Sequence, residues 1–257
     1  MKPFYRRSLD ELNRKWIFGA VSIFVAVALG FFSVYVQSNR LDGASVPQDV
    51  GSESSAESAK VGRLMPDSYY DDPWVYFIGD SYTEGTAADS GRGSLWSSIV
   101  CDSRRWYERN LGMDGSGYAT NGRDGKNYIG QIQASRLEGA DGVVVSGGLN
   151  DVARGVSLDE LRSRVSQTFT LIRSYAPRVP FTVLSVFNPF PDQSTNIRIM
   201  NDILRSEAFR VGAVFVEASD LIRGDQKLLG PGGLELDDQG HAAIAAVVGG
   251  QIAEPIR

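Results

Sequence analysis

The chain has 257 residues, 42% of them hydrophobic, and a formal net charge of −5, with one cysteine and one histidine. A single cysteine excludes an intramolecular disulfide, and one cysteine with one histidine excludes the common Cys/His zinc clusters. Because the charge is negative and no basic tract follows the first residues, we expect no nucleic-acid binding, and no metal or cofactor is predicted.

The first predicted element is an uncharged apolar run over residues 16–36. At a rise of about 1.5 Å per residue, this run can cross the ~30 Å hydrocarbon core of a lipid bilayer as one transmembrane helix. Basic residues gather in residues 1–15, and only Arg40 follows closely. The positive-inside rule therefore predicts a cytoplasmic N-terminal tail and an extracytoplasmic domain. Since the run is long and no small-residue cleavage site follows closely, we expect a retained anchor in the cell membrane rather than a signal peptide.

Residues 37–70 are polar and acidic, which is typical of a flexible linker. Residues 71–257 have the length of one α/β domain that can bury a core without disulfides.

The apolar run of residues 74–78 predicts the first strand of this domain, and Gly-Asp-Ser-Tyr-Thr-Glu-Gly follows at residues 79–85. Ser81 then lies at the carboxyl edge of the sheet, where open α/β sheets bind their ligands. A hydroxyl nucleophile beside its own backbone N–H is half of an acyl-transfer site. The alternative is that Ser81 only caps the helix that follows.

Two further strands bring polar groups to the same edge. Residues 105–110 predict the second strand, which leads into a glycine-rich block over residues 110–118. Residues 143–145 predict the third strand, followed by Gly-Gly-Leu-Asn-Asp. The Asn150 amide can donate a hydrogen bond to an oxyanion, although an Asn-Asp pair also forms turns.

The remaining strands and helices alternate, which requires a mostly parallel sheet with right-handed crossovers. The edges of the first three strands then converge on Ser81, Gly115 and Asn150. A helix is predicted over residues 158–175, with Ser157 as its N-cap and Pro177 ending it. The remaining predicted elements are a strand over 180–187, a helix over 197–209, a strand over 213–217 and a helix over 242–252.

The Gly-Asp-Ser block at residues 79–81 and the Gly-x-Asn-Asp block at residues 148–151 together resemble the SGNH (GDSL-type) hydrolase family. The resemblance covers the chain from about Trp74 to its C-terminus. It implies a three-layer α/β/α sandwich with a flavodoxin-like, five-stranded, mostly parallel sheet. It also implies esterase, lipase or carbohydrate-deacetylase chemistry, with Ser81 as the nucleophile.

The same resemblance implies an oxyanion hole made by the Ser81 N–H, a glycine N–H and the Asn150 side chain. We assign the glycine as Gly115, with Gly112 and Gly117 as alternatives.

The catalytic base is open between two alignments. The family ends with an Asp and a His three residues apart, and Asp238 and His241 have this spacing. On this reading Asp238 orients the imidazole and His241 takes the proton of Ser81. In the competing alignment, Gly240-His241 matches a later Gly-His, and Gly232 and Glu235 take the Asp and His places. The protein then lacks its base or uses the weaker Glu235.

The leading hypothesis is a membrane-anchored, extracytoplasmic serine esterase that hydrolyses short-chain or acetyl esters of glycans or lipids. Transfer of the acyl group to a sugar or lipid is open as well. The hypothesis from another class is a non-catalytic surface or glycan-binding module that kept the fold and lost the general base.

Overall fold

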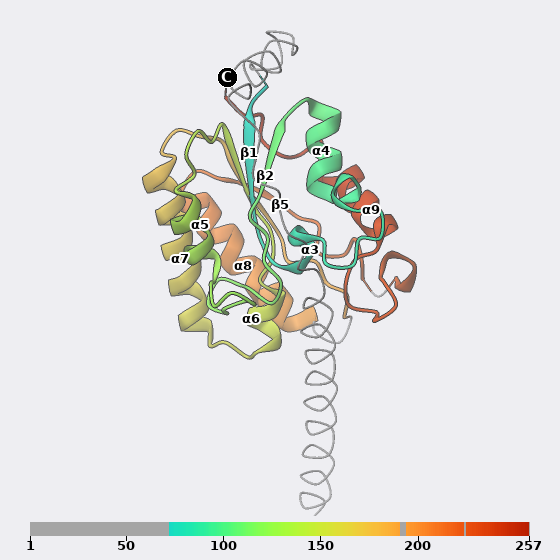
Figure 1. The fold of residues 1–257 in the computed structure, drawn as a ribbon. Coiled ribbons are helices and arrows are strands. Elements are labelled where there is room, and N and C mark those ends of the chain that lie inside the picture. Colours follow the sequence, from blue (N-terminus) through green and yellow to red (C-terminus); the bar gives the residue numbers. More distant parts are fainter. Residues whose placement is uncertain (1–71, 191–193, 224, 257) are drawn as a thin grey trace, which may run out of the picture. The chain divides into compact units, whose positions relative to one another are not determined.

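The computed structural model describes residues 72–190, 194–223 and 225–256, and these form an α/β fold around one parallel sheet (Figure 1). The strand order is β2-β1-β3-β4-β5, and every pair of neighbours is parallel. This is the flavodoxin-like order, in which the chain reverses direction across the sheet beside β1. The strands are β1 (Trp74–Ile78), β2 (Tyr107–Asn110), β3 (Gly142–Val145), β4 (Phe181–Leu184) and β5 (Val214–Val216).

Helices cover both faces of this sheet (Figure 1). On one face lie α5 (Tyr128–Ser135), α7 (Leu158–Tyr175) and α8 (Ser194–Arg210), and on the other lie α4 (Trp96–Arg104) and α9 (Asp238–Val248). Two short helices follow strand ends, α3 (Ser81–Glu84) after β1 and α6 (Leu149–Ala153) after β3. Single 3₁₀ turns form at η2 (Arg92–Ser94) and η4 (Gln226–Leu228).

Each face of the sheet has its own hydrophobic core, because successive strand residues point to opposite sides. In β1, Tyr76 and Ile78 pack toward α5, α7 and α8. Val75 and Phe77 pack toward α4 and α9, where the Phe77 ring meets Trp96 edge to face at 5.3 Å. Burying one such side chain stabilises the fold by roughly 1.5–3 kcal/mol.

Several predicted elements are confirmed. The first strand and the long helix α7 have the predicted bounds, and the Ser157 side chain accepts the Glu160 N–H at 3.3 Å as the N-cap. The fourth strand is shorter than predicted, because the Asn201 side chain, not a neighbouring strand, accepts the Val186 N–H.

The last helix was predicted wrongly at both ends. It begins at Asp238, four residues before the predicted start, because the Asp237 side chain accepts the Gly240 N–H at 2.8 Å and caps it there. It ends at Val248, with Gly249 as the C-cap, and not at Ile252.

The predicted tail, transmembrane helix and linker over residues 1–70 lie outside the described residues and stay predictions. Within the described part of the chain, none of the helices combines the length and the apolar character needed to cross a bilayer.

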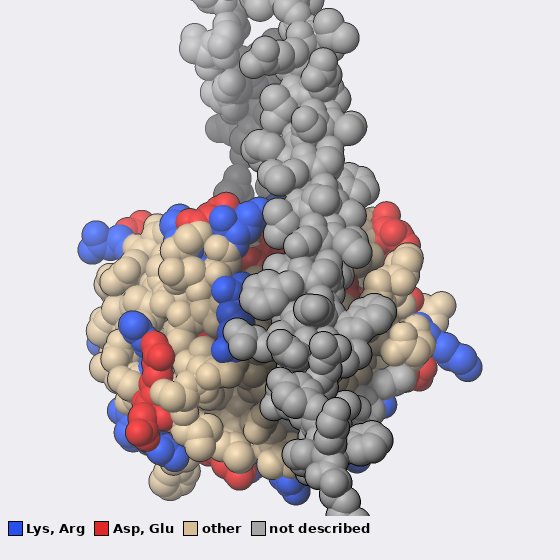
Figure 2. Space-filling model, turned by 90° about the horizontal axis from the view of Figure 1, so that it is seen from below, with Lys and Arg blue, Asp and Glu red and all other residues tan. Residues whose placement is uncertain are grey.

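Figure 2 looks onto the side of the domain where α3 and α6 follow their strands. On the part of this face that is visible, acidic and basic side chains are interspersed.

Candidate active site

Ser81 is the first residue of α3, directly behind the carboxyl end of β1. The turn is tight: a Cβ on Gly79 would lie 2.2 Å from the Thr83 hydroxyl and 2.8 Å from the Ser146 carbonyl oxygen, so only glycine fits. The N-cap is Asp80, whose carboxylate accepts the Tyr82 N–H at 3.1 Å. The helix-capping role considered for Ser81 therefore belongs to Asp80.

Ser81 opens into a cavity of about 130 Å³, here called the serine cavity. Its polar lining comes from Asp80, Ser81, Asp114, Asn150 and Glu235, and its apolar lining includes Leu149, Val186, Phe187 and Leu234. The predicted Ser81 and Asn150 are thus brought together, as the convergence of strand ends requires.

Asn150 lies in the first turn of α6, and its side chain holds the glycine-rich block. Its Nδ2 donates to the Ser116 carbonyl oxygen at 2.9 Å. An amide nitrogen carries two hydrogens, so the second is available to a ligand in the serine cavity.

The neighbouring Asp151 has a role that the sequence reasoning missed. Its side chain is fully buried and accepts three backbone N–H groups, from Tyr118 at 2.7 Å, Ala119 at 3.0 Å and Thr120 at 2.9 Å. Asp151 thereby fixes the end of the glycine-rich block against α6. The sequence held one signal for this role, because Asp151 directly follows Asn150 in the segment after a buried strand.

The three candidate glycines differ in what their backbone N–H groups do. The Gly112 N–H donates to the Asn110 side chain at 2.9 Å, and the Gly117 N–H donates to the Thr120 carbonyl oxygen at 2.9 Å. Among the described residues the Gly115 N–H has no acceptor, and Gly115 takes a left-handed φ of 71° that favours glycine. Gly115 itself does not line the serine cavity, but its neighbour Asp114 does. Its role as a donor stays a prediction.

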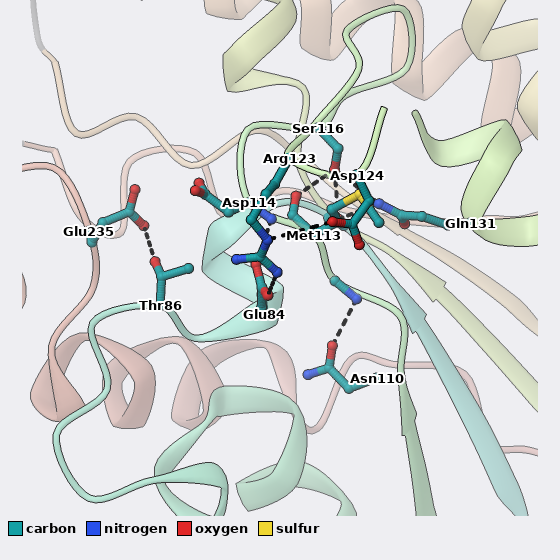
Figure 3. Close-up of polar contacts among 12 residues, drawn as sticks. Glu84, Thr86, Asn110, Met113, Asp114, Ser116, Arg123, Asp124, Gln131 and Glu235 are labelled. Atoms are coloured by element: carbon teal, nitrogen blue, oxygen red, sulfur yellow. Dashed lines mark hydrogen bonds and ion pairs between the residues drawn. The ribbon is translucent and has the colours of Figure 1, made fainter. Parts of the chain in front are cut away.

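Glu84 ties this block to α3. Its carboxylate accepts the Asp114 N–H at 2.6 Å and pairs with the Arg123 guanidinium at 2.6 Å (Figure 3). The loop beside Ser81 is therefore held from two sides, by Glu84 and by Asp151.

Glu235, the alternative base, lies in the serine cavity. Figure 3 shows its carboxylate turned toward Thr86, whose hydroxyl donates to Glu235 Oε2 at 3.2 Å. Burial raises the pKa of Glu235, while hydrogen bonds from the Ser81 and Thr86 side chains act in the opposite direction. Gly232, the partner in the competing alignment, is exposed and supplies no side chain to orient Glu235.

His241, the predicted base, is not in the serine cavity. Its side chain is completely buried, and Nδ1 accepts the Trp96 N–H at 3.3 Å at the start of α4. Burial lowers the pKa of His241 to about 4. His241 is buried because α9 begins at Asp238, which places His241 on the inward face of the helix with Ile244 and Val248.

Asp238, the predicted orienting acid, also faces elsewhere. Its carboxylate accepts the Ser90 hydroxyl at 2.5 Å and the Ser94 hydroxyl at 2.8 Å, and these bonds lower its pKa. The structure therefore does not assemble Ser81, Asp238 and His241 into the predicted triad, and this part of the prediction is corrected.

Asp80 adds a second perturbed carboxyl to the serine cavity. Burial raises its pKa to about 7, against the lowering effect of the Tyr82 N–H, and the charge of Glu235 raises it further. The site thus holds a serine hydroxyl, amide donors and carboxyl groups, which suits proton transfer and oxyanion stabilisation.

Comparison with known proteins points to one family. Residues 77–243 match the family model described as the GDSL-like lipase/acylhydrolase family. A GDSL lipase of Mycobacterium tuberculosis is 30% identical over 181 residues, which cover 66% of this chain and 78% of that protein.

Solved structures share the fold at lower identity. A lipolytic protein of the G-D-S-L family from Desulfitobacterium hafniense superposes with a TM-score of 0.57 at 16% identity, covering 71% of this chain and all of that one. An acetyl xylan esterase from Geobacillus stearothermophilus gives a TM-score of 0.53 at 19% identity, covering 72% of this chain and 96% of that one.

Proposed function

Because the chain belongs to the GDSL-like lipase/acylhydrolase family, we propose that it hydrolyses esters of small acyl groups with Ser81 as the nucleophile. Membership gives the reaction class: the protein is a carboxylic ester hydrolase. The observation that carries the proposal is the opening of Ser81 into the serine cavity beside Asn150.

In the proposed reaction, Ser81 Oγ attacks the ester carbonyl carbon and forms a tetrahedral oxyanion. The Ser81 N–H donates to no other described residue, and Asn150 keeps one amide hydrogen free. These two groups, with the Gly115 N–H, are the donors we assign to the oxyanion. Departure of the alcohol leaves an acyl-enzyme, which water then hydrolyses.

The size of the serine cavity supports a short acyl chain. Its volume of about 130 Å³ is below the ~300–1,000 Å³ of pockets that enclose drug-sized ligands. Apolar side chains on its wall suit a methyl or short alkyl group, so acetyl esters are the favoured class.

The location of the reaction is proposed from the sequence alone. An anchor at residues 16–36 would hold the domain outside the membrane, beside glycans and lipid headgroups. We therefore include esters of surface glycans or lipids in the proposal, with transfer of the acyl group to another hydroxyl as a variant of the same chemistry.

The test is hydrolysis of p-nitrophenyl acetate, butyrate and octanoate by the full chain in detergent. We expect kcat/KM for acetate to exceed that for octanoate by at least about 10-fold. Ser81→Ala should lower kcat/KM by more than about 10³-fold while the protein stays folded. Turnover that survives in Ser81→Ala would contradict the assignment. A folded wild type that turns over none of the esters would favour the binding module.

A further inference from the structure

The serine cavity holds a carboxylate where the predicted imidazole was expected, and we propose that Glu235 is the proton acceptor of Ser81. This inference rests on the proposed function above. It also assigns His241 to the seam between α4 and α9, with no part in the reaction.

The position of Glu235 is set by backbone contacts on both sides of it. The Gly230 N–H donates to the Glu235 carbonyl oxygen at 2.8 Å, and Leu229 bridges to Leu236 in antiparallel fashion. The Tyr82 hydroxyl, on α3, donates to the Leu234 carbonyl oxygen at 2.6 Å. The segment that carries Glu235 is therefore fastened to the helix that carries Ser81.

One hydroxyl donor holds the side chain of Glu235, and the nucleophile lies in the same cavity. Thr86, which follows α3, donates to Oε2 at 3.2 Å, and Ser81 lines the serine cavity close enough for its side chain to lower the pKa of Glu235. A carboxylate held beside the nucleophile in one cavity is placed to act as a general base. Thr86 takes the orienting place for which Gly232 has no side chain.

The surroundings of Glu235 raise its proton affinity, which favours a role as a general base. Burial raises the pKa of Glu235, and the charges of Asp114 and Glu84 raise it too. Asp80, the remaining acid of the serine cavity, has its own pKa raised to about 7 and is partly neutral near that pH. A carboxyl whose pKa lies above its ordinary value accepts a proton more readily at neutral pH than an unperturbed one.

Glu235 takes up and returns one proton in each half of the proposed reaction. As the Ser81 Oγ–carbon bond forms, the Ser81 proton moves to a Glu235 carboxylate oxygen. The bond between the carbonyl carbon and the alcohol oxygen then breaks, and the alcohol leaves with the proton from Glu235. In deacylation Glu235 takes a proton from the attacking water, and Ser81 Oγ regains a proton as the acyl group leaves.

A test independent of the natural ester is the rate at which a fluorophosphonate labels Ser81 in the full chain, measured from pH 4 to 9. The variants are Glu235→Gln, which keeps the shape but cannot accept a proton, and Glu235→His. His241→Asn is the matched control, because Asn retains an acceptor for the Trp96 N–H and cannot titrate. Melting temperatures establish that each variant is folded.

We expect Glu235→Gln to slow labelling by about 10²-fold or more. Glu235→His should label efficiently, with its rise in rate moved toward the imidazole pKa of about 6.5. His241→Asn should label like the wild type. Wild-type labelling rates in Glu235→Gln, or a wild-type pH profile in Glu235→His, would overturn the proposal even if Gln destabilises the fold. Ester hydrolysis is a separate readout: labelling that depends on Glu235 without hydrolysis would contradict the proposed function alone.

Discussion

The serine cavity holds Glu235 where His241 was expected, and His241 lies instead in the seam between α4 and α9. Glu235 lies half-buried in the cavity of Ser81, the proposed nucleophile, and its pKa is raised. His241 is sealed between helices against Trp96, and its pKa is lowered to about 4. Burial disfavours the charged form in both places, and it therefore moves an acid and a base in opposite directions.

The difference teaches that reactivity follows position rather than residue type. An imidazole has the better intrinsic pKa for a neutral-pH base, but His241 is buried on the inward face of α9 and does not line the serine cavity. A carboxylate is a weaker base, but Glu235 shares the cavity with Ser81 and Asn150.

Among the variants that separate the two regions, removing an amide donor from the serine cavity should have the largest effect. Asn150→Ala should lower kcat by about 10²–10³-fold, because one amide donor to the oxyanion is lost. Esterase kinetics measure this, and chemical denaturation measures the accompanying stability loss of about 1 kcal/mol from the bond to Ser116.

Asn127→Ala is the matched control for that variant. Asn127 caps α5 by accepting the Gly130 N–H at 3.1 Å, so its loss also destabilises the fold by about 1 kcal/mol. Its kcat should stay at the wild-type value. If both variants lose activity equally, Asn150 acts through stability and not through the oxyanion.

The sequence predicted the sheet well, because its signals are local. Buried apolar runs that end just before glycine-containing turns marked β1 and β3, and the parallel topology then required Ser81 and Asn150 to meet at one edge. The helices α4 and α5 were missed, since Ser97 and Ser98 interrupt the first and Gly130 interrupts the second.

The catalytic base could not be assigned from the sequence, because the assignment depends on the residue at which α9 begins. Asp237 and Asp238 are both plausible caps, and a shift by a few residues decides whether His241 points into the core or toward the strand ends. Glu235 was recognisable as a candidate base only through the competing alignment, which puts Gly232 in the place of the family's Asp. Its contact with Thr86 joins residues 149 positions apart, and no local pattern shows this.

The second expected effect concerns His241 in the seam between α4 and α9. The stability of the fold should depend on pH because of this residue. An unfolded chain protonates His241 below about pH 6.5, whereas the folded chain resists protonation until about pH 4. The wild type therefore loses stability from this residue as the pH falls from 6.5 to 4, by about 3 kcal/mol in total.

Asp80 acts with the opposite sign, since its pKa of about 7 makes the folded state gain protons, and stability, as the pH falls below 7. The measurement is therefore the difference in unfolding free energy between wild type and His241→Asn at pH 7.5 and pH 4.5. Asp80 cancels in this difference, and the advantage of the wild type should shrink at the lower pH. A difference that is constant with pH would mean that His241 is protonated as easily in the folded state as in the unfolded state.

The smallest expected effect tests the assignment of Glu235 by changing its pKa while the carboxylate itself is retained. The Thr86 hydroxyl donates to Glu235 Oε2 and stabilises the ionised carboxylate, so Thr86→Val should raise the pKa of Glu235. This hydrogen bond is exposed and contributes at most about 0.5–1.5 kcal/mol, so the expected change is small. The acidic limb of kcat/KM should move to higher pH while the plateau stays near the wild-type value, because the base is retained. An unmoved limb with an unchanged plateau would mean that Thr86 does not orient Glu235 in the working enzyme.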